Sequence, residues 1–76
     1  MKDIVKKPPA VVAEQLYQYR MKAGITREVL SALSGVSVNS IASYEQGRRN
    51  PKIEAIYTLA KALGCTIDKL CREESE

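Results

Sequence analysis

Three uncharged polar side chains and two arginines lie close together in one stretch of this chain. Asn39, Ser43 and Gln46 are spaced i, i+4 and i+7, which places them on one face of a helix. The exposed face of a helix usually carries Lys and Glu, whereas this face carries hydrogen-bonding groups without charge. Arg48 and Arg49 follow directly after it. From this segment alone, the face is either ordinary polar surface or a surface that hydrogen-bonds another molecule.

The chain lacks the residues that most catalytic and metal sites require. It has no histidine and two cysteines, Cys65 and Cys71. Ser-His and Cys-His catalysis are therefore excluded within the chain, and a structural zinc site needs four Cys or His ligands. We predict no enzyme activity, no cofactor and no metal site. Cys65 is expected in the core because its neighbours are apolar, and Cys71 is expected to be a free thiol, which suits the reducing cytosol.

Length and charge indicate one small domain with a basic bias. Seventy-six residues, 45% of them hydrophobic and 28% charged, fit a single globular domain with a small core and little room for an enclosed active site. The net charge is +3, with +4 on residues 1–50 and −1 on residues 51–76, which is compatible with a nucleic-acid partner. No apolar run is long enough to span a bilayer, and no apolar signal segment follows the N-terminal lysines. We expect a cytoplasmic protein without a membrane partner.

Five short helices must position these residues. The Pro8-Pro9 pair predicts a basic, flexible arm over residues 1–9, and the first helix is expected to begin at Ala10. The N-cap candidates of later helices are Thr26, Ser37 and Thr66, and the glycines expected to end the first four helices are Gly24, Gly35, Gly47 and Gly64. No strand is predicted. The fold class is therefore all-α, with a helical domain over residues 10–71 and an acidic tail over residues 72–76.

The connection between the second and third helices is short. Only Gly35-Val36-Ser37 separates them, and a turn of this length with Gly between two short helices is the signature of helix-turn-helix. Further motif residues from about Val12 to Leu70 have the matching spacing; they are Leu16, Tyr19, Arg20, Gly24, Ile25, Thr26, Leu30, Ile41, Glu45, Gly47, Pro51, Leu59, Ala60, Leu63 and Gly64. On these residues the chain resembles the Xre family, the phage-repressor and Cro type of helix-turn-helix domain. The resemblance implies a compact five-helix, lambda-repressor-like fold that binds DNA, usually as a symmetric homodimer.

The same resemblance implies which residues face DNA. It places the helix around residues 38–46 in the major groove, with base contacts from Ser37, Val38, Asn39 and Ser43. Phosphate contacts are implied for Arg20, Thr26, Arg27, Ser40, Arg48, Arg49, Asn50 and Lys52. A further pair, Arg20 and Glu45, links the first helix to the third. This explains the small polar face, because short side chains let a helix approach base edges, and Asn can bond N6 and N7 of adenine.

Five positions depart from the family pattern. Arg27 stands where Gln is common, Ser31 stands where Ala is common, and Lys52 stands where Ser or Asp often caps the fourth helix. Val29 and Leu33 fall where the family is usually polar. These two apolar residues either widen the core stripe or form an exposed patch, which would be covered by Ile4 and Val5 of the arm or by another protein chain.

The sequence therefore favours a sequence-specific regulator of transcription that binds double-stranded DNA as a homodimer and acts as a repressor. The alternative is an antitoxin-like or other protein-interaction module, in which a helix face of the same fold binds a protein partner.

Overall fold

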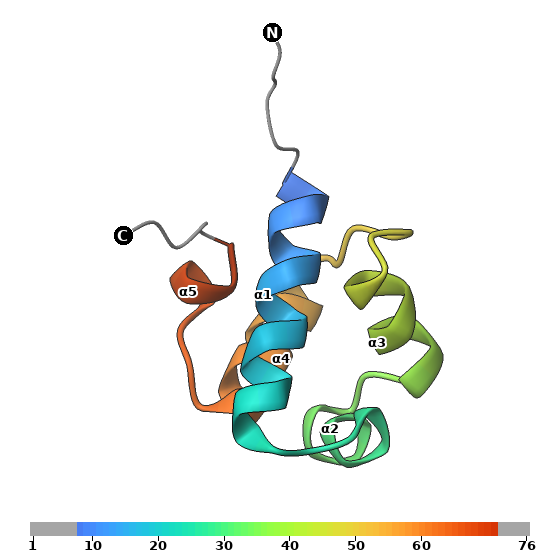
Figure 1. Ribbon diagram of the computed structural model, residues 1–76, viewed down its shortest axis with the longest axis vertical. Coiled ribbons are helices and arrows are strands. Elements are labelled where there is room, and N and C mark those ends of the chain that lie inside the picture. The colour runs from blue at the N-terminus through green and yellow to red at the C-terminus, as the bar shows by residue number, and fades with distance from the viewer. Residues whose placement is uncertain (1–7, 72–76) are drawn as a thin grey trace, which may run out of the picture.

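The structure, a computed structural model, describes residues 8–71 and places them in five helices (Figure 1). These are α1 (Pro8–Ala23), α2 (Arg27–Ser34), α3 (Val38–Glu45), α4 (Ile53–Leu63) and α5 (Ile67–Cys71). No strand occurs within this range, so the predicted all-α, five-helix class is confirmed. None of the helices between residues 8 and 71 has both the length and the apolar character needed to cross a membrane.

The first helix begins two residues earlier than predicted. We expected Pro8 and Pro9 to exclude regular structure, and both lie in the first turn of α1. Proline is tolerated there because the first N–H groups of a helix have no intrahelical acceptor and the ring already fixes a helical φ. The predicted arm over residues 1–9 otherwise lies outside the described residues, as does the predicted acidic tail over residues 72–76.

Capping hydrogen bonds set the helix starts around the turn. The hydroxyl oxygen of Thr26 accepts a hydrogen bond from the Val29 backbone N–H at 3.1 Å, and that of Ser37 accepts one from the Ser40 N–H at 3.1 Å. Both residues are therefore the N-caps that the sequence predicted. Gly35 ends α2 with φ +80°, a left-handed conformation that side chains with a Cβ rarely adopt.

Each helix contributes one side chain that is fully buried. α1 packs against α3 on one side and α5 on the other, while α2 packs against α3 and α4 (Figure 1). The five residues that meet inside are Leu16, Leu30, Ile41, Leu59 and Leu70. Leu70 of the short last helix therefore belongs to the core, and Ile67 packs against that core.

Val29 and Leu33 do not widen the core. The exposed fractions of these residues are 43% and 62%, whereas their neighbour Leu30 is completely buried. The core alternative for these two residues is therefore wrong. Ile4 and Val5, which could cover the patch, lie outside the described residues.

A network of charged side chains joins the three N-terminal helices. Arg20 of α1 donates from Nε to Oε2 of Glu45 at 2.7 Å and from Nη2 to Oε1 at 3.0 Å. Its Nη1 donates to the backbone oxygen of Ile25 at 2.9 Å. Arg27, the first residue of α2, donates from Nε to Oε1 of Glu45 at 3.0 Å. The predicted Arg20–Glu45 pair is thus present, and a second arginine joins it.

This network is buried at its centre. The side chain of Glu45 is 2% exposed and that of Arg20 is 10% exposed. The hydrogen bond to Glu45 raises the pKa of Arg20 above its ordinary value, so the guanidinium stays charged at any physiological pH. One carboxylate on α3 consequently fixes the angle of that helix to α1 and to the start of α2.

The two arginines should contribute very differently to stability. Arg20→Ala leaves a buried carboxylate with one half-exposed partner, and we expect it to lower the free energy of unfolding by about 3 kcal/mol or more. Arg27→Ala leaves the Arg20–Glu45 pair intact and should cost less than about 1 kcal/mol. Urea unfolding followed by circular dichroism measures both values. Equal costs for the two variants would contradict the assigned roles.

The exposed apolar pair on α2 gives a second comparison. Val29→Lys places a charge at a position that is open to solvent and should change the unfolding free energy by less than about 0.5 kcal/mol. Leu30→Ala, one position along, creates a cavity in the core and should cost about 2–5 kcal/mol. Thermal and urea unfolding of the two variants make the comparison. A large loss in Val29→Lys would mean that another segment or chain covers the patch.

Candidate nucleic-acid interface

α3 presents a polar outer face and an apolar inner face. Ile41 and Tyr44 are buried against the core, while Asn39 is exposed and Ser43 is half-buried on the opposite side. Val38 is half-buried at the first position of the helix. The predicted base-contacting residues of the helix are therefore not used by the core, and the inner residues anchor the helix so that this face stays outward.

The two serines at the start of α3 hydrogen-bond each other. Besides accepting from the Ser40 N–H, the Ser37 hydroxyl donates to the Ser40 hydroxyl oxygen at 3.0 Å. This leaves the Ser37 oxygen one further lone pair as an acceptor. Ser37 is exposed and Ser40 is half-buried, so both lie at the protein surface where the turn meets the helix.

Two arginines follow α3 and differ in how firmly they are held. The backbone N–H groups of Arg48 and Arg49 bond to the carbonyl oxygen of Ser43 at 2.9 and 3.4 Å, which folds the loop back onto the end of α3. The guanidinium of Arg49 lies 5.4 Å from the centre of the Tyr44 ring, and its Nη1 makes a long hydrogen bond of 3.4 Å to the Ser40 hydroxyl. Within residues 8–71 the exposed Arg48 side chain has no such contact.

The remaining predicted phosphate contacts lie at the surface, with one exception. Thr26, Asn50 and Lys52 are exposed and Arg27 is partly exposed. Lys52 precedes α4 without a side-chain cap, as its departure from the family pattern suggested. Arg20 is 8% exposed and donates from three nitrogens within the network, so the structure gives it a structural role. A phosphate contact by Arg20 stays a prediction.

Two features of this surface were not predicted from the sequence. The hydrogen bond of Arg27 to Glu45 joins residues that are 18 positions apart, and no periodicity connects them. The stacking of Arg49 on Tyr44 crosses the end of a helix, where the loop conformation decides the contact. The positions of the arginines in the sequence indicated a positively charged surface. They did not indicate which side chains the guanidinium groups would contact.

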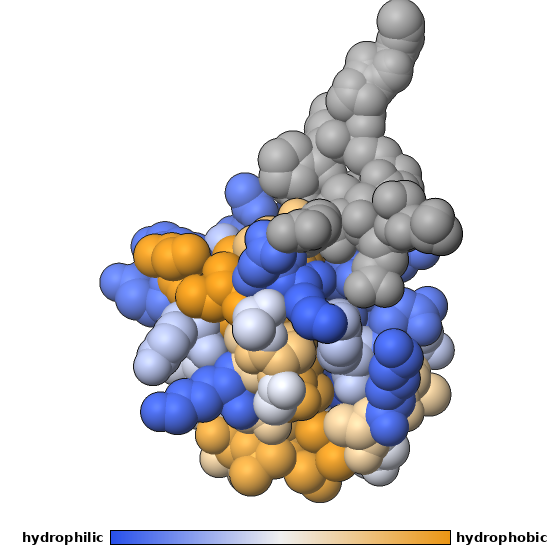
Figure 2. Space-filling view, turned by 90° about the vertical axis from the view of Figure 1, so that its left-hand side faces the viewer, coloured by the Kyte–Doolittle hydropathy of each residue, from blue (hydrophilic) through white to orange (hydrophobic). Residues whose placement is uncertain are grey.

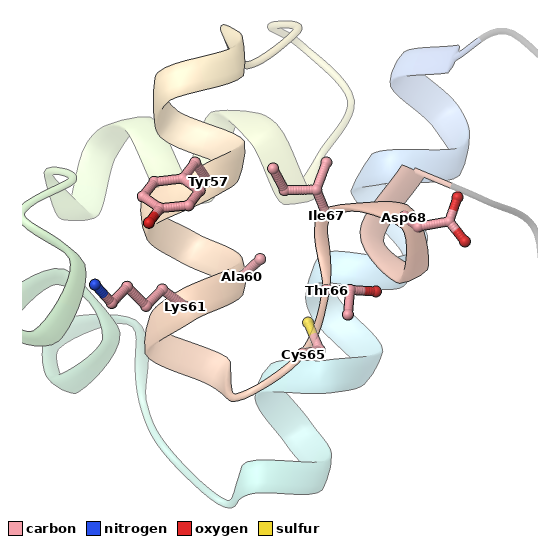
Figure 3. Close-up of a pocket in the computed structure, with 7 residues that line it drawn as sticks. All are labelled: Tyr57, Ala60, Lys61, Cys65, Thr66, Ile67 and Asp68. Atoms are coloured by element: carbon pink, nitrogen blue, oxygen red, sulfur yellow. The ribbon is translucent and has the colours of Figure 1, made fainter.

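Away from α3 there is an open hollow of about 500 Å³ between α4 and α5 (Figure 3). Tyr57, Ala60, Cys65 and Ile67 line its apolar centre, while Lys61 and Asp68 extend to opposite sides. Cys65 is half-buried, and this burial raises the pKa of its thiol, as burial also does for Cys71. Raised pKa values make both thiols poor nucleophiles. The two charged side chains at the hollow, Lys61 and Asp68, do not point toward each other.

Similar proteins support the five-helix fold and the helix-turn-helix assignment of α2 and α3. A family model described as Helix-turn-helix matches residues 16–70. The uncharacterized HTH-type transcriptional regulator y4dJ of Sinorhizobium fredii is 41% identical over 54 residues, which cover 71% of this chain and 70% of that protein.

Two solved structures are also similar. The P22 c2 repressor, in complex with a synthetic operator, has 30% identity and a TM-score of 0.77, over 83% of this chain and 96% of that one. The restriction-modification controller protein C.AhdI from Aeromonas hydrophila has 29% identity and a TM-score of 0.78, over 82% and 94%. These similarities do not favour the antitoxin-like alternative. The chain belongs to the Xre-like helix-turn-helix family of DNA-binding transcriptional regulators.

Proposed function

We propose that this protein is a repressor that binds a specific sequence of double-stranded DNA with α3 in the major groove. The observation that carries the proposal is the arrangement of α3. Its inner side is anchored by Ile41, Tyr44 and the Glu45 network, and its outer side presents Asn39, while Arg27 bonds to the last residue of the helix and Arg48 and Arg49 follow it. A major groove admits an α-helix, and short polar side chains can then reach base edges.

The base contacts are divided among four residues of the turn and the helix. Asn39 can make two hydrogen bonds to adenine, through N6 and N7, and Ser43 can donate or accept. Val38 can pack against the methyl group of thymine. Ser37 contributes its remaining lone pair to a donor on a base or to a bridging water.

Phosphate contacts flank these residues and set the register of the protein on DNA. Arg27 at the start of α2 and Arg48 and Arg49 after α3 supply the charge. Further contacts come from Thr26 beside Arg27, from Asn50 and Lys52 after Arg49, and from Ser40 within α3, whose hydroxyl oxygen accepts from Nη1 of Arg49.

We propose that the protein binds as a homodimer, because a palindromic operator presents two equivalent half-sites to a two-fold symmetric protein. The surface around Ile67 at the hollow between α4 and α5 is a candidate for the contact. Figure 2 views the molecule from the side on which α5 lies, and on this face apolar side chains alternate with charged ones. We propose that the protein is cytoplasmic, because a DNA-binding regulator must share a compartment with its DNA.

Selection of binding sites from a random DNA library tests the proposal and separates the roles of the residues. Asn39→Ala should cost about 1–3 kcal/mol on the best site and relax the preference at one base pair of each half-site. Arg48→Ala should weaken all sequences about equally and lower the salt slope by about one per contact.

The wild-type protein supplies the control for these variants. If a dimer contacts about 6–10 phosphates, its affinity for any duplex should fall by orders of magnitude between about 50 and 200 mM salt. A flat salt response, or an unchanged sequence preference in Asn39→Ala, would contradict the proposal.

A further inference from the structure

The carboxylate of Glu45 holds its two arginines in unequal ways. Arg20 approaches with two nitrogens, one for each carboxylate oxygen, and its third nitrogen bonds to the backbone of Ile25. Arg27 approaches with Nε alone, at 3.0 Å from Oε1. Each of the three nitrogens of Arg20 thus donates a hydrogen bond, whereas the two terminal nitrogens of Arg27 have no hydrogen bond to any residue between 8 and 71.

The charges of the network are distributed in the same unequal way. Two guanidinium groups and one carboxylate carry a net charge of +1. The Arg20–Glu45 pair is buried, with side chains that are 10% and 2% exposed, and it is neutral as a unit. The side chain of Arg27 is 33% exposed, so the uncompensated positive charge lies at its outer edge, at the start of α2.

We infer that Glu45 is a positioning residue for DNA binding, which holds the guanidinium of Arg27 by Nε so that its terminal nitrogens are available to a phosphate of the DNA backbone. The inference rests on the proposed function. An unrestrained arginine has several flexible torsions, and ordering it on binding costs free energy. The hydrogen bond to Glu45 orders Arg27 before DNA arrives, and it leaves the fork that matches a phosphate unoccupied.

Positioning by Glu45 and simple charge repulsion by its carboxylate have opposite effects on DNA affinity. A carboxylate close to DNA repels the phosphates, so removal of its charge by Glu45→Gln should tighten DNA binding if Coulomb interactions decide. If Glu45 positions Arg27, the same substitution weakens binding, because a neutral amide holds the arginines less strongly than a carboxylate. In either orientation the amide also places its NH2 group against an arginine N–H, a donor facing a donor. The sign of the change therefore separates the two accounts.

A double-mutant cycle in DNA affinity provides the test. The wild-type protein, Arg27→Ala, Glu45→Gln and the double variant are titrated against a short fluorescent duplex of random sequence, at a temperature where circular dichroism shows each variant folded. We expect Arg27→Ala to weaken binding about tenfold in the wild-type protein and only about twofold in the Glu45→Gln background. Arg48→Ala is the matched control, since its side chain has no contact with Glu45, and it should cost the same in both backgrounds.

Arg27→Lys provides a test that leaves Glu45 unchanged and does not depend on how well the Gln variant folds. Lysine keeps the charge, but it cannot bond Glu45 and present a fork to phosphate at the same time. We expect its affinity to fall nearly as far as that of Arg27→Ala, with little change in the melting temperature.

Two results would overturn the inference while leaving the proposed function intact. One is an additive cycle with tighter DNA binding in Glu45→Gln, and the other is wild-type affinity in Arg27→Lys. Absence of salt-dependent DNA binding by the wild-type protein would overturn both the inference and the function on which it rests.

Discussion

The ion pair between Arg20 and Glu45 is the contact on which the presentation of α3 depends. Apolar packing among Leu16, Leu30 and Ile41 has no direction of its own, and α3 could tilt or turn slightly without losing much of it. The paired hydrogen bonds at 2.7 and 3.0 Å are directional, and the carboxylate is nearly inaccessible to water. A shift of α3 would expose or unpair a buried charge, which is costly.

Because of this ion pair, the residues that hold α3 in place and the residues that we propose to contact DNA lie on different sides of the helix. Ile41, Tyr44 and Glu45 face inward and fix the helix, which frees Asn39 and Ser43 from any role in packing. Two arginines contact the last two residues of α3, and both are restrained: Arg27 by Glu45 and Arg49 by the ring of Tyr44. The surface that we propose to face DNA is therefore ordered by contacts to the domain interior.

Much of this arrangement could be predicted from local signals. The N-caps at Thr26 and Ser37 and the glycine turn follow from residue chemistry within a few positions, and the Arg20–Glu45 pair followed from the family resemblance. The start of α1 was misjudged, because a proline pair is compatible with a first helical turn. The core or surface position of Val29 and the Arg27–Glu45 bond depend on how helices cross, which no short sequence pattern encodes.

The central claim is that α3 binds in the major groove, and base analogues test it most directly. A duplex obtained by selection is synthesised with 7-deazaadenine at each adenine in turn, which removes the major-groove acceptor N7 and leaves the minor groove unchanged. The account predicts a loss of affinity of about 1–3 kcal/mol at one adenine of each half-site, and no such loss in Asn39→Ala. An affinity that no 7-deazaadenine substitution changes, but that a minor-groove ligand abolishes, would contradict binding of α3 in the major groove.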